Sequence, residues 1–189
     1  GKLAYNSRVI KRKDKTFVSL SQSSELIVED DKGRAIERHR VNYGTIIYFQ
    51  NGSKIKQGDI IAKWDPLTRP IIAEVSGKAK FVDLEDGITA RLKKDELTGL
   101  SNMEIIDARE RPKGEAQNKR PAIHIVDSRG NEKKIPDSEA QAIYILPGNA
   151  FLQLTDGQEI EVGSEIARIS QESVKTKDIT GGLPRVADL

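Results

Sequence analysis

Residues 43–63, which read YGTIIYFQNGSKIKQGDIIAK, decide the fold. Two apolar runs lie on either side of Asn51-Gly52, and a second turn follows at Gly58-Asp59. An Asn-Gly pair between apolar runs is a strong hairpin signal, because the tight turn requires positive φ. The stretch therefore predicts a pair of short antiparallel strands with a further tight turn.

The same pattern returns in residues 147–168, PGNAFLQLTDGQEIEVGSEIAR. After a one-residue insertion the turn glycines align as Gly44 with Gly148, Gly52 with Gly157, and Gly58 with Gly163. Upstream, residues 27–33 similarly match residues 123–130. Two copies of one β module explain the repeat. Chance similarity of two hairpins is the alternative, since turn glycines recur in any β protein.

The remaining sequence is also rich in short β-branched and aromatic runs separated by turn residues, without a sustained helical period. We therefore predict an all-β fold. The order strand, Asn/Asp-Gly, strand, Gly-Asp resembles biotinyl and lipoyl carriers and the wider barrel-sandwich hybrid family. Together with the repeat, the resemblance predicts two tandem barrel-sandwich hybrid-like modules, followed by a short C-terminal loop or helix start. We place the modules at residues 1–105 and 106–172, with a polar linker at 109–121 and a separate segment at 173–189.

The composition excludes several classes of protein. The 189 residues contain no cysteine, which removes disulfides, thiolate zinc sites and cysteine nucleophiles. No apolar run is long enough to span a membrane. The densest group of cations is a basic cluster with two interpretations: a solvated hairpin edge whose lysines discourage aggregation, or a contact with DNA. The cluster consists of Lys11, Arg12, Lys13 and Lys15.

Residues with catalytic potential are sparse. His39 and His124 are the only histidines, and each is expected to be a half-exposed strand residue. The carboxylates lack metal-site spacing, and no phosphate-binding loop or nucleophile elbow is present. Residues 65–70, DPLTRP, occupy the position where carrier domains hold a modified lysine, and they contain none. We predict no catalytic residue, no metal site and no bound cofactor in this chain. The residues instead predict a β-rich interaction module.

The last residues, 176–189, differ from the rest and read TKDITGGLPRVADL. Asp178 or Thr180 could cap a helix, and Pro184 suits a first helical turn. The unfinished amphipathic pattern suggests that this sequence is part of a longer chain. The string resembles the second arm of the trigger loop in the β′ subunit of bacterial RNA polymerase.

The preceding body is similar to the large trigger-loop insertion of proteobacterial β′ subunits. The likeness spans essentially the whole chain, is strongest at residues 41–101 and 143–189, and is loose over the first 20 residues. The supporting stretches are residues 75–77, 95–101, 121–122, 146–148 and 167–173.

The resemblance implies a role in DNA-templated RNA synthesis from nucleoside triphosphates, a nucleotidyl transfer whose catalytic residues lie outside this chain. The insertion would modulate trigger-loop folding, elongation and pausing in a bacterial cytoplasm. The full subunit would hold Mg²⁺ and Zn²⁺. The partners would be the rest of β′, the α, β and ω subunits, sigma factor, template DNA and RNA, with no membrane. The arm and hinge residues would be Thr180, Gly181, Gly182, Leu183, Pro184 and Arg185.

Two other functions remain open from the sequence. One is a carrier-like or partner-docking β module of another complex, although the missing lysine speaks against a carrier. The other is a general nucleic-acid-binding module, which would need clustered cations.

Overall fold

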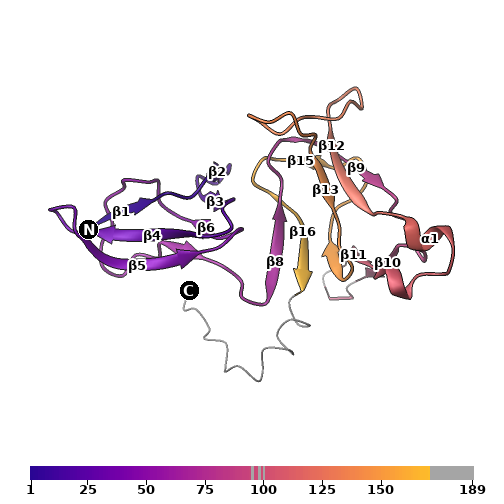
Figure 1. Ribbon diagram of the computed structural model, residues 1–189, viewed down its shortest axis with the longest axis horizontal. Coiled ribbons are helices and arrows are strands. Elements are labelled where there is room, and N and C mark those ends of the chain that lie inside the picture. The colour runs from indigo at the N-terminus through magenta and orange to yellow at the C-terminus, as the bar shows by residue number, and fades with distance from the viewer. Residues whose placement is uncertain (95, 98, 100, 171–189) are drawn as a thin grey trace, which may run out of the picture. The chain divides into compact units, whose positions relative to one another are not determined.

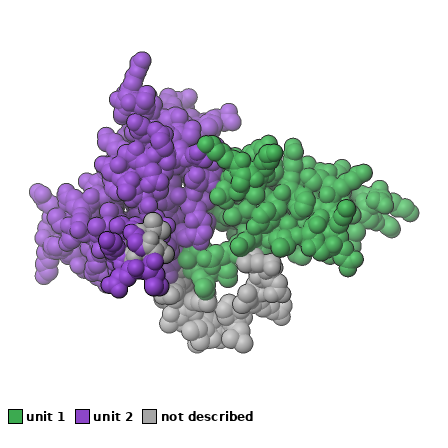
Figure 2. Space-filling model, turned by 180° about the vertical axis from the view of Figure 1, so that it is seen from behind, with its two compact units in different colours: residues 1–69, 179–189 green, residues 70–178 purple. Residues whose placement is uncertain are grey.

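A computed structural model describes residues 1–94, 96, 97, 99 and 101–170. This part of the chain is almost entirely strand and turn, and its two helical elements are single short turns, η1 (Ala108–Glu110) and α1 (Glu115–Asn118). The predicted all-β class is confirmed. The chain divides into two compact units, which we call module 1 (residues 1–69) and module 2 (residues 70–170) (Figures 1 and 2).

Module 1 contains two antiparallel sheets (Figure 1). The first has the order β1-β4-β5, with strands Lys2–Tyr5, Ser24–Glu29 and Ala35–Val41. The second has the order β2-β3-β6-β7, with strands Val9–Lys11, Phe17–Ser19, Ile46–Ile47 and Ala62–Lys63. Apolar side chains from both sheets form one core. That core consists of Leu3, Tyr5, Leu26, Val41, Ile47, Ile55 and Ala62.

Module 2 also contains two sheets. The first has the order β13-β12-β9-β15, with strands Ile143–Ile145, Ala122–Val126, Gly77–Val82 and Glu159–Ile160. The second has the order β10-β11-β14-β16-β8, with strands Ala90–Lys94, Ser101–Ile105, Ala150–Leu152, Glu165–Ser170 and Thr68–Ile72. The division between the units falls inside β8, whose first two residues close module 1. A larger core lies in this module. Its fully buried members include Ala73, Ala90, Ile105, Ile123, Ile125 and Ala150.

The two modules are copies of one fold, and their strand registers show this directly. Ile46 pairs with Lys63 in module 1, and Phe151 pairs with Arg168 in module 2. Adding 105 to each number of the first pair therefore gives the second pair. The same offset of 105 relates each of residues 44–63 to its counterpart in module 2, without any insertion. The chance-similarity alternative is thereby excluded, because unrelated hairpins would not share a register.

One detail of the predicted alignment is wrong. The counterpart of Gly44 is Asn149, whereas Gly148 is the counterpart of Tyr43. Gly44 has φ 87° and Asn149 has φ 69°, and each donates its backbone N–H to the equivalent residue of the neighbouring strand, Ser19 or Ile105. The one-residue insertion in the predicted alignment was needed only because Gly44 was assumed to match Gly148. Asparagine also adopts the left-handed conformation. An alignment that pairs only glycine with glycine therefore misses Asn149.

Side-chain hydrogen bonds repeat as well. The backbone N–H of Tyr5 donates to Asn51 Oδ1 at 2.9 Å, and the N–H of Phe81 donates to Asp156 Oδ1 at 2.9 Å. In the hairpin turns, Asp30 Oδ1 accepts from the N–H of Lys32 at 2.9 Å, as Asp127 Oδ1 does from that of Arg129 at 2.8 Å. The repeat therefore extends into the N-terminal half of each module.

The structure divides the chain at residues 69 and 70 instead of the predicted 105 and 106. β9 pairs with β12 and β15, and β11 pairs with β14, so residues 77–105 belong to module 2. The visible sequence repeat covers only the C-terminal half of each copy. A boundary placed between the visible repeats therefore cut module 2 in two. The barrel-sandwich hybrid description of the modules stays a prediction, and segment 173–189 lies outside the described residues.

The polar stretch 109–121 is not a linker between modules. It lies inside module 2, between β11 and β12, and contains α1 and the last two residues of η1. In module 1 the equivalent connection, from Leu20 to Ser24, has only three intervening residues. Module 2 thus carries a lobe, residues 107–120, that module 1 lacks.

Candidate interaction surfaces

The predicted basic cluster lies on the hairpin between β2 and β3. Lys11 ends β2, and the turn is closed by the N–H of Arg12, which donates to the carbonyl of Thr16 at 2.8 Å. The hairpin therefore gathers the four cations, and Lys11, Lys13 and Lys15 are exposed. Hydrogen bonds from Thr16 lower the pKa of Asp14, so a carboxylate lies among them. A contact between this cluster and DNA stays a prediction.

The lobe of module 2 is held by a buried arginine. Arg111 is 7% exposed. Its guanidinium donates to the carbonyls of Ile106 at 3.0 Å, Ala116 at 3.3 Å and Lys119 at 2.7 Å. These three carbonyls come from both ends of the lobe, so one side chain fixes its path. The sequence showed the polar composition of this region but not the burial of one arginine among its charged residues.

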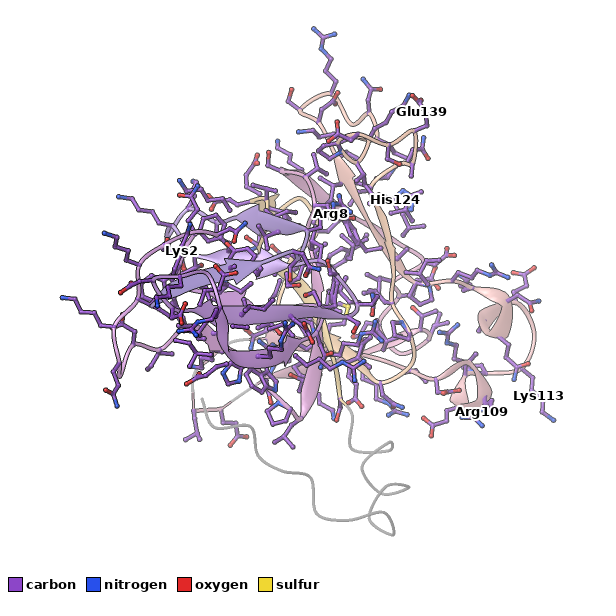
Figure 3. All side chains as sticks on the ribbon, turned by 60° about the vertical axis from the view of Figure 1, so that its left-hand side comes forward. Lys2, Arg8, Arg109, Lys113, His124 and Glu139 are labelled. Carbon is purple, nitrogen blue, oxygen red and sulfur yellow. The ribbon has the colours of Figure 1, made fainter. Side chains whose placement is uncertain are left out.

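Ion pairs attach the lobe to the rest of module 2. Lys119 Nζ lies 2.7 Å from Glu85 Oε2, and this hydrogen bond raises the pKa of Lys119. Within the lobe, hydrogen bonds from Arg109 lower the pKa of Asp107. Figure 3 shows Arg109 and Lys113 beside the two helical turns, at the outer edge of the module. The lobe is therefore an ordered, charged projection.

A second addition to module 2 is the hairpin between β12 and β13. Module 1 has three residues between Arg34 and Arg38, whereas module 2 has eleven between their counterparts, Asn131 and Ile143. His124 Nδ1 on β12 lies 2.7 Å from Glu132 Oε1 at the start of this hairpin. Glu139, near its tip, projects away from the sheets in Figure 3. Both histidines lie on strands as expected. The His39 side chain is half-exposed, at 52%, whereas that of His124 is only 16% exposed, so the predicted exposure is wrong for His124.

Among the described residues, no group of three or more His, Asp or Glu side chains is placed to hold a metal ion. None of their helices is long and apolar enough to cross a membrane. At the carrier position, Asp65 accepts from the N–H of Leu67 and from Thr68 Oγ1, each at 2.8 Å, and so stabilises a turn. The predicted hinge residues, Thr180, Gly181, Gly182, Leu183, Pro184 and Arg185, lie outside the described part of the chain.

Comparison with known proteins gives a specific result. No family model matches the chain. It is 46% identical over 185 residues to the "DNA-directed RNA polymerase subunit beta'" of Pseudomonas paraeruginosa, and 48% identical over 185 residues to that of Shewanella amazonensis. It is 49% identical over 184 residues to the Colwellia psychrerythraea subunit.

The first two of these matches cover 98% of this chain and the third covers 97%, but each spans only 13% of the relative's length. The matched residues therefore include nearly all of both modules. Identity near one half over such a length reflects common descent and a shared fold. The chain is therefore homologous, over almost all its residues, to one segment of the bacterial DNA-directed RNA polymerase β′ subunits.

Proposed function

We propose that this chain forms part of a DNA-directed RNA polymerase β′ subunit and acts there as an insertion in the trigger loop. The observation that carries the proposal is the match of 98% of the chain to 13% of the β′ subunits. The resemblance of residues 176–189 to the second trigger-loop arm supports the position within the subunit. The polymerase would catalyse nucleotidyl transfer, and this chain would contribute no catalytic group.

The physical role follows from attachment to a moving loop. Enzyme lids close over substrate and order the reactants. Two folded modules tethered to such a lid must move whenever the lid folds. Contacts that they make in only one state would shift the balance between open and closed states by their difference in free energy. Gly181 and Gly182 would act as the hinge, because glycine allows large backbone changes.

The partners and cofactors of the whole enzyme belong to the same proposal. The rest of β′, the α, β and ω subunits, sigma factor, DNA and RNA would surround this segment in the bacterial cytoplasm. Magnesium and zinc would be held elsewhere in the subunit. Zinc sites of the thiolate type cannot form from this sequence, because it contains no cysteine.

Deleting residues 2–172 from the intact polymerase tests the role. We expect altered lifetimes at pause sites and an altered rate of transcript cleavage, with nucleotide addition still occurring on templates without pauses. A matched control replaces only the lobe, residues 107–120, with the three-residue connection of module 1, which keeps both modules. Unchanged kinetics at every pause site after the full deletion would contradict the proposal.

A further inference from the structure

The outermost strand of one sheet in module 2 has an apolar edge. β13 is the last strand in the order β13-β12-β9-β15, so among the described residues only β12 pairs with it. Its two isoleucines, Ile143 and Ile145, are 39% and 63% exposed. Edge strands of natural proteins commonly carry charged side chains, which discourage another strand from pairing with them. The exposed isoleucines leave this edge without that protection.

The equivalent edge of module 1 has the usual protection. β5 is the last strand of the sheet β1-β4-β5, and the offset of 105 makes Arg38 the counterpart of Ile143 and Arg40 the counterpart of Ile145. Both arginines are exposed. Because the same fold accepts arginines or isoleucines at these positions, the core does not require the isoleucines. Their presence in module 2 therefore indicates that this edge meets an apolar partner.

The backbone of β13 also offers hydrogen-bonding groups at this edge. The N–H of Leu146 donates to the carbonyl of Pro121 at 2.9 Å. Hydrogen-bonded positions alternate along an antiparallel pair, so the N–H and carbonyl of Ile145 point away from β12, as does the carbonyl of Ile143. The N–H of Ile143 already donates to the carbonyl of Gln141 at 2.9 Å. A further strand can therefore hydrogen-bond to both main-chain groups of Ile145 and to the carbonyl of Ile143.

Two additions that module 1 lacks lie at the two ends of β13. The added hairpin, residues 132–142, leads directly into the strand. The other end is followed by Gly148, where a Cβ would lie 2.9 Å from the Cα of Asp107 at the base of the lobe. The lobe, residues 107–120, contains five Lys and Arg against three Asp and Glu, whereas residues 132–142 contain two against three. One end of this edge is therefore cationic and the other is slightly anionic.

We propose that β13 is a docking site for an extended segment of a partner protein, which adds to the sheet as an antiparallel strand. Main-chain hydrogen bonds give such a strand its affinity, and alternate side chains give it specificity. The residues opposite Ile143 and Ile145 are apolar, because apolar cross-strand pairs are stabilising. An antiparallel segment runs from the lobe toward the hairpin, so acidic residues precede its apolar residues and basic residues follow them. The inference uses only module 2 and does not depend on the proposed function.

The test titrates the 189-residue chain with a fluorescent peptide of sequence EEVTVTVKK, which has this pattern. The double variant Ile143→Arg, Ile145→Arg introduces the arginines of module 1 and is expected to weaken binding about tenfold, because two apolar cross-strand pairs are lost. The matched control Leu92→Lys removes a 55% exposed leucine from the edge strand β10, where the counterpart in module 1 is Lys11. It is expected to change the affinity by less than about twofold. Circular dichroism checks that both variants fold.

Two further measurements distinguish strand addition from other kinds of binding. Hydrogen exchange of the Ile145 amide should slow when EEVTVTVKK is bound, because this N–H gains a main-chain acceptor. The peptide EEVTPTVKK should bind about tenfold more weakly, because its central proline lacks the N–H that a strand needs. Tighter binding of the charge-reversed peptide KKVTVTVEE would overturn the antiparallel direction.

Three results would overturn the docking site itself: no binding of EEVTVTVKK at millimolar concentration, equal binding by the arginine variant, or an Ile145 amide that the peptide does not protect. Sedimentation that shows a dimer of the unaltered chain, lost in the arginine variant, would instead identify a second copy as the occupant. None of these outcomes bears on pause kinetics after deletion of residues 2–172, so failure here and failure of the proposed function are distinguishable.

Discussion

Arg111 is the residue on which the lobe of module 2 depends most. Its guanidinium is buried and donates to three carbonyls from both ends of the lobe. Loss of a buried donor leaves its acceptors without partners, which costs about 1–3 kcal/mol. We expect Arg111→Met to lower the free energy of unfolding by about 2 kcal/mol, measured by urea denaturation. Arg109→Met, which removes an exposed arginine from the same lobe, should change it by less than about 1 kcal/mol. Equal losses of unfolding free energy in the two variants would show that Arg111 does not hold the two ends of the lobe together.

Gly44 and Gly148 are glycines for different physical reasons, which gives a second test. Gly44 has φ 87°, and its counterpart Asn149 shows that asparagine adopts this conformation in the same fold. A Cβ at Gly148 would lie 2.9 Å from the Cα of Asp107, which is too close for any side chain. We expect Gly44→Asn to cost less than about 1 kcal/mol and Gly148→Asn to cost about 1–3 kcal/mol. Thermal unfolding of the two variants compares them. A larger loss for Gly44→Asn would contradict the assigned register.

At the scale of elements, we expect the Asx turns after β4 and β12 to make the stability of the chain depend on pH. Hydrogen bonds from the backbone N–H groups of Arg34 and Asn131 are the main cause of the lowered pKa values of Asp30 and Asp127, whose ordinary value is 3.8. A carboxyl whose pKa is lowered by folding stabilises the protein above its unfolded pKa. That contribution is lost as pH falls through the folded pKa.

We therefore expect the double variant Asp30→Asn, Asp127→Asn to lose less stability than the unaltered chain between neutral pH and about pH 3. Urea midpoints at both pH values measure this difference. Asp31→Asn, in the same turn, provides a control, because it removes a carboxylate without removing these hydrogen bonds. Parallel pH profiles for the double variant and the unaltered chain would contradict the assignment.

The strands and turns also show which features of the fold can be predicted from the sequence. The apolar runs and the Asn-Gly and Asp-Gly pairs correctly predict short strands and turns, because those preferences are local. The hairpins predicted across these pairs are wrong: β14 and β15 lie on either side of Asp156-Gly157, yet they belong to different sheets. Strand partners are not local: nothing near β9 in the sequence indicates that it pairs with β12 rather than with β8. The domain boundary depends on those partners, so the prediction placed it wrongly.

At the scale of the whole molecule, the position of the boundary has a direct consequence. A cut between residues 69 and 70 leaves each module with its own core. A cut between residues 105 and 106 separates β9 from β12 and β11 from β14. We expect fragments 1–69 and 70–170 to give dispersed amide NMR spectra, and fragment 106–170 to give the narrow spectrum of an unfolded chain. A folded fragment 106–170 would contradict the module assignment.

The central claim is that this chain belongs to the β′ subunit of an RNA polymerase. The most direct test is to measure the mass of the native polypeptide and to identify the proteins that co-purify with it. Residues 107–120 form an ordered, exposed lobe and are a suitable epitope for an antibody. Capture from a bacterial lysate, followed by mass spectrometry, should yield a polypeptide far larger than 21.0 kDa together with other polymerase subunits. A free chain of 21.0 kDa, or one accompanied by subunits of a carboxylase, would contradict the claim and leave only the duplicated β module.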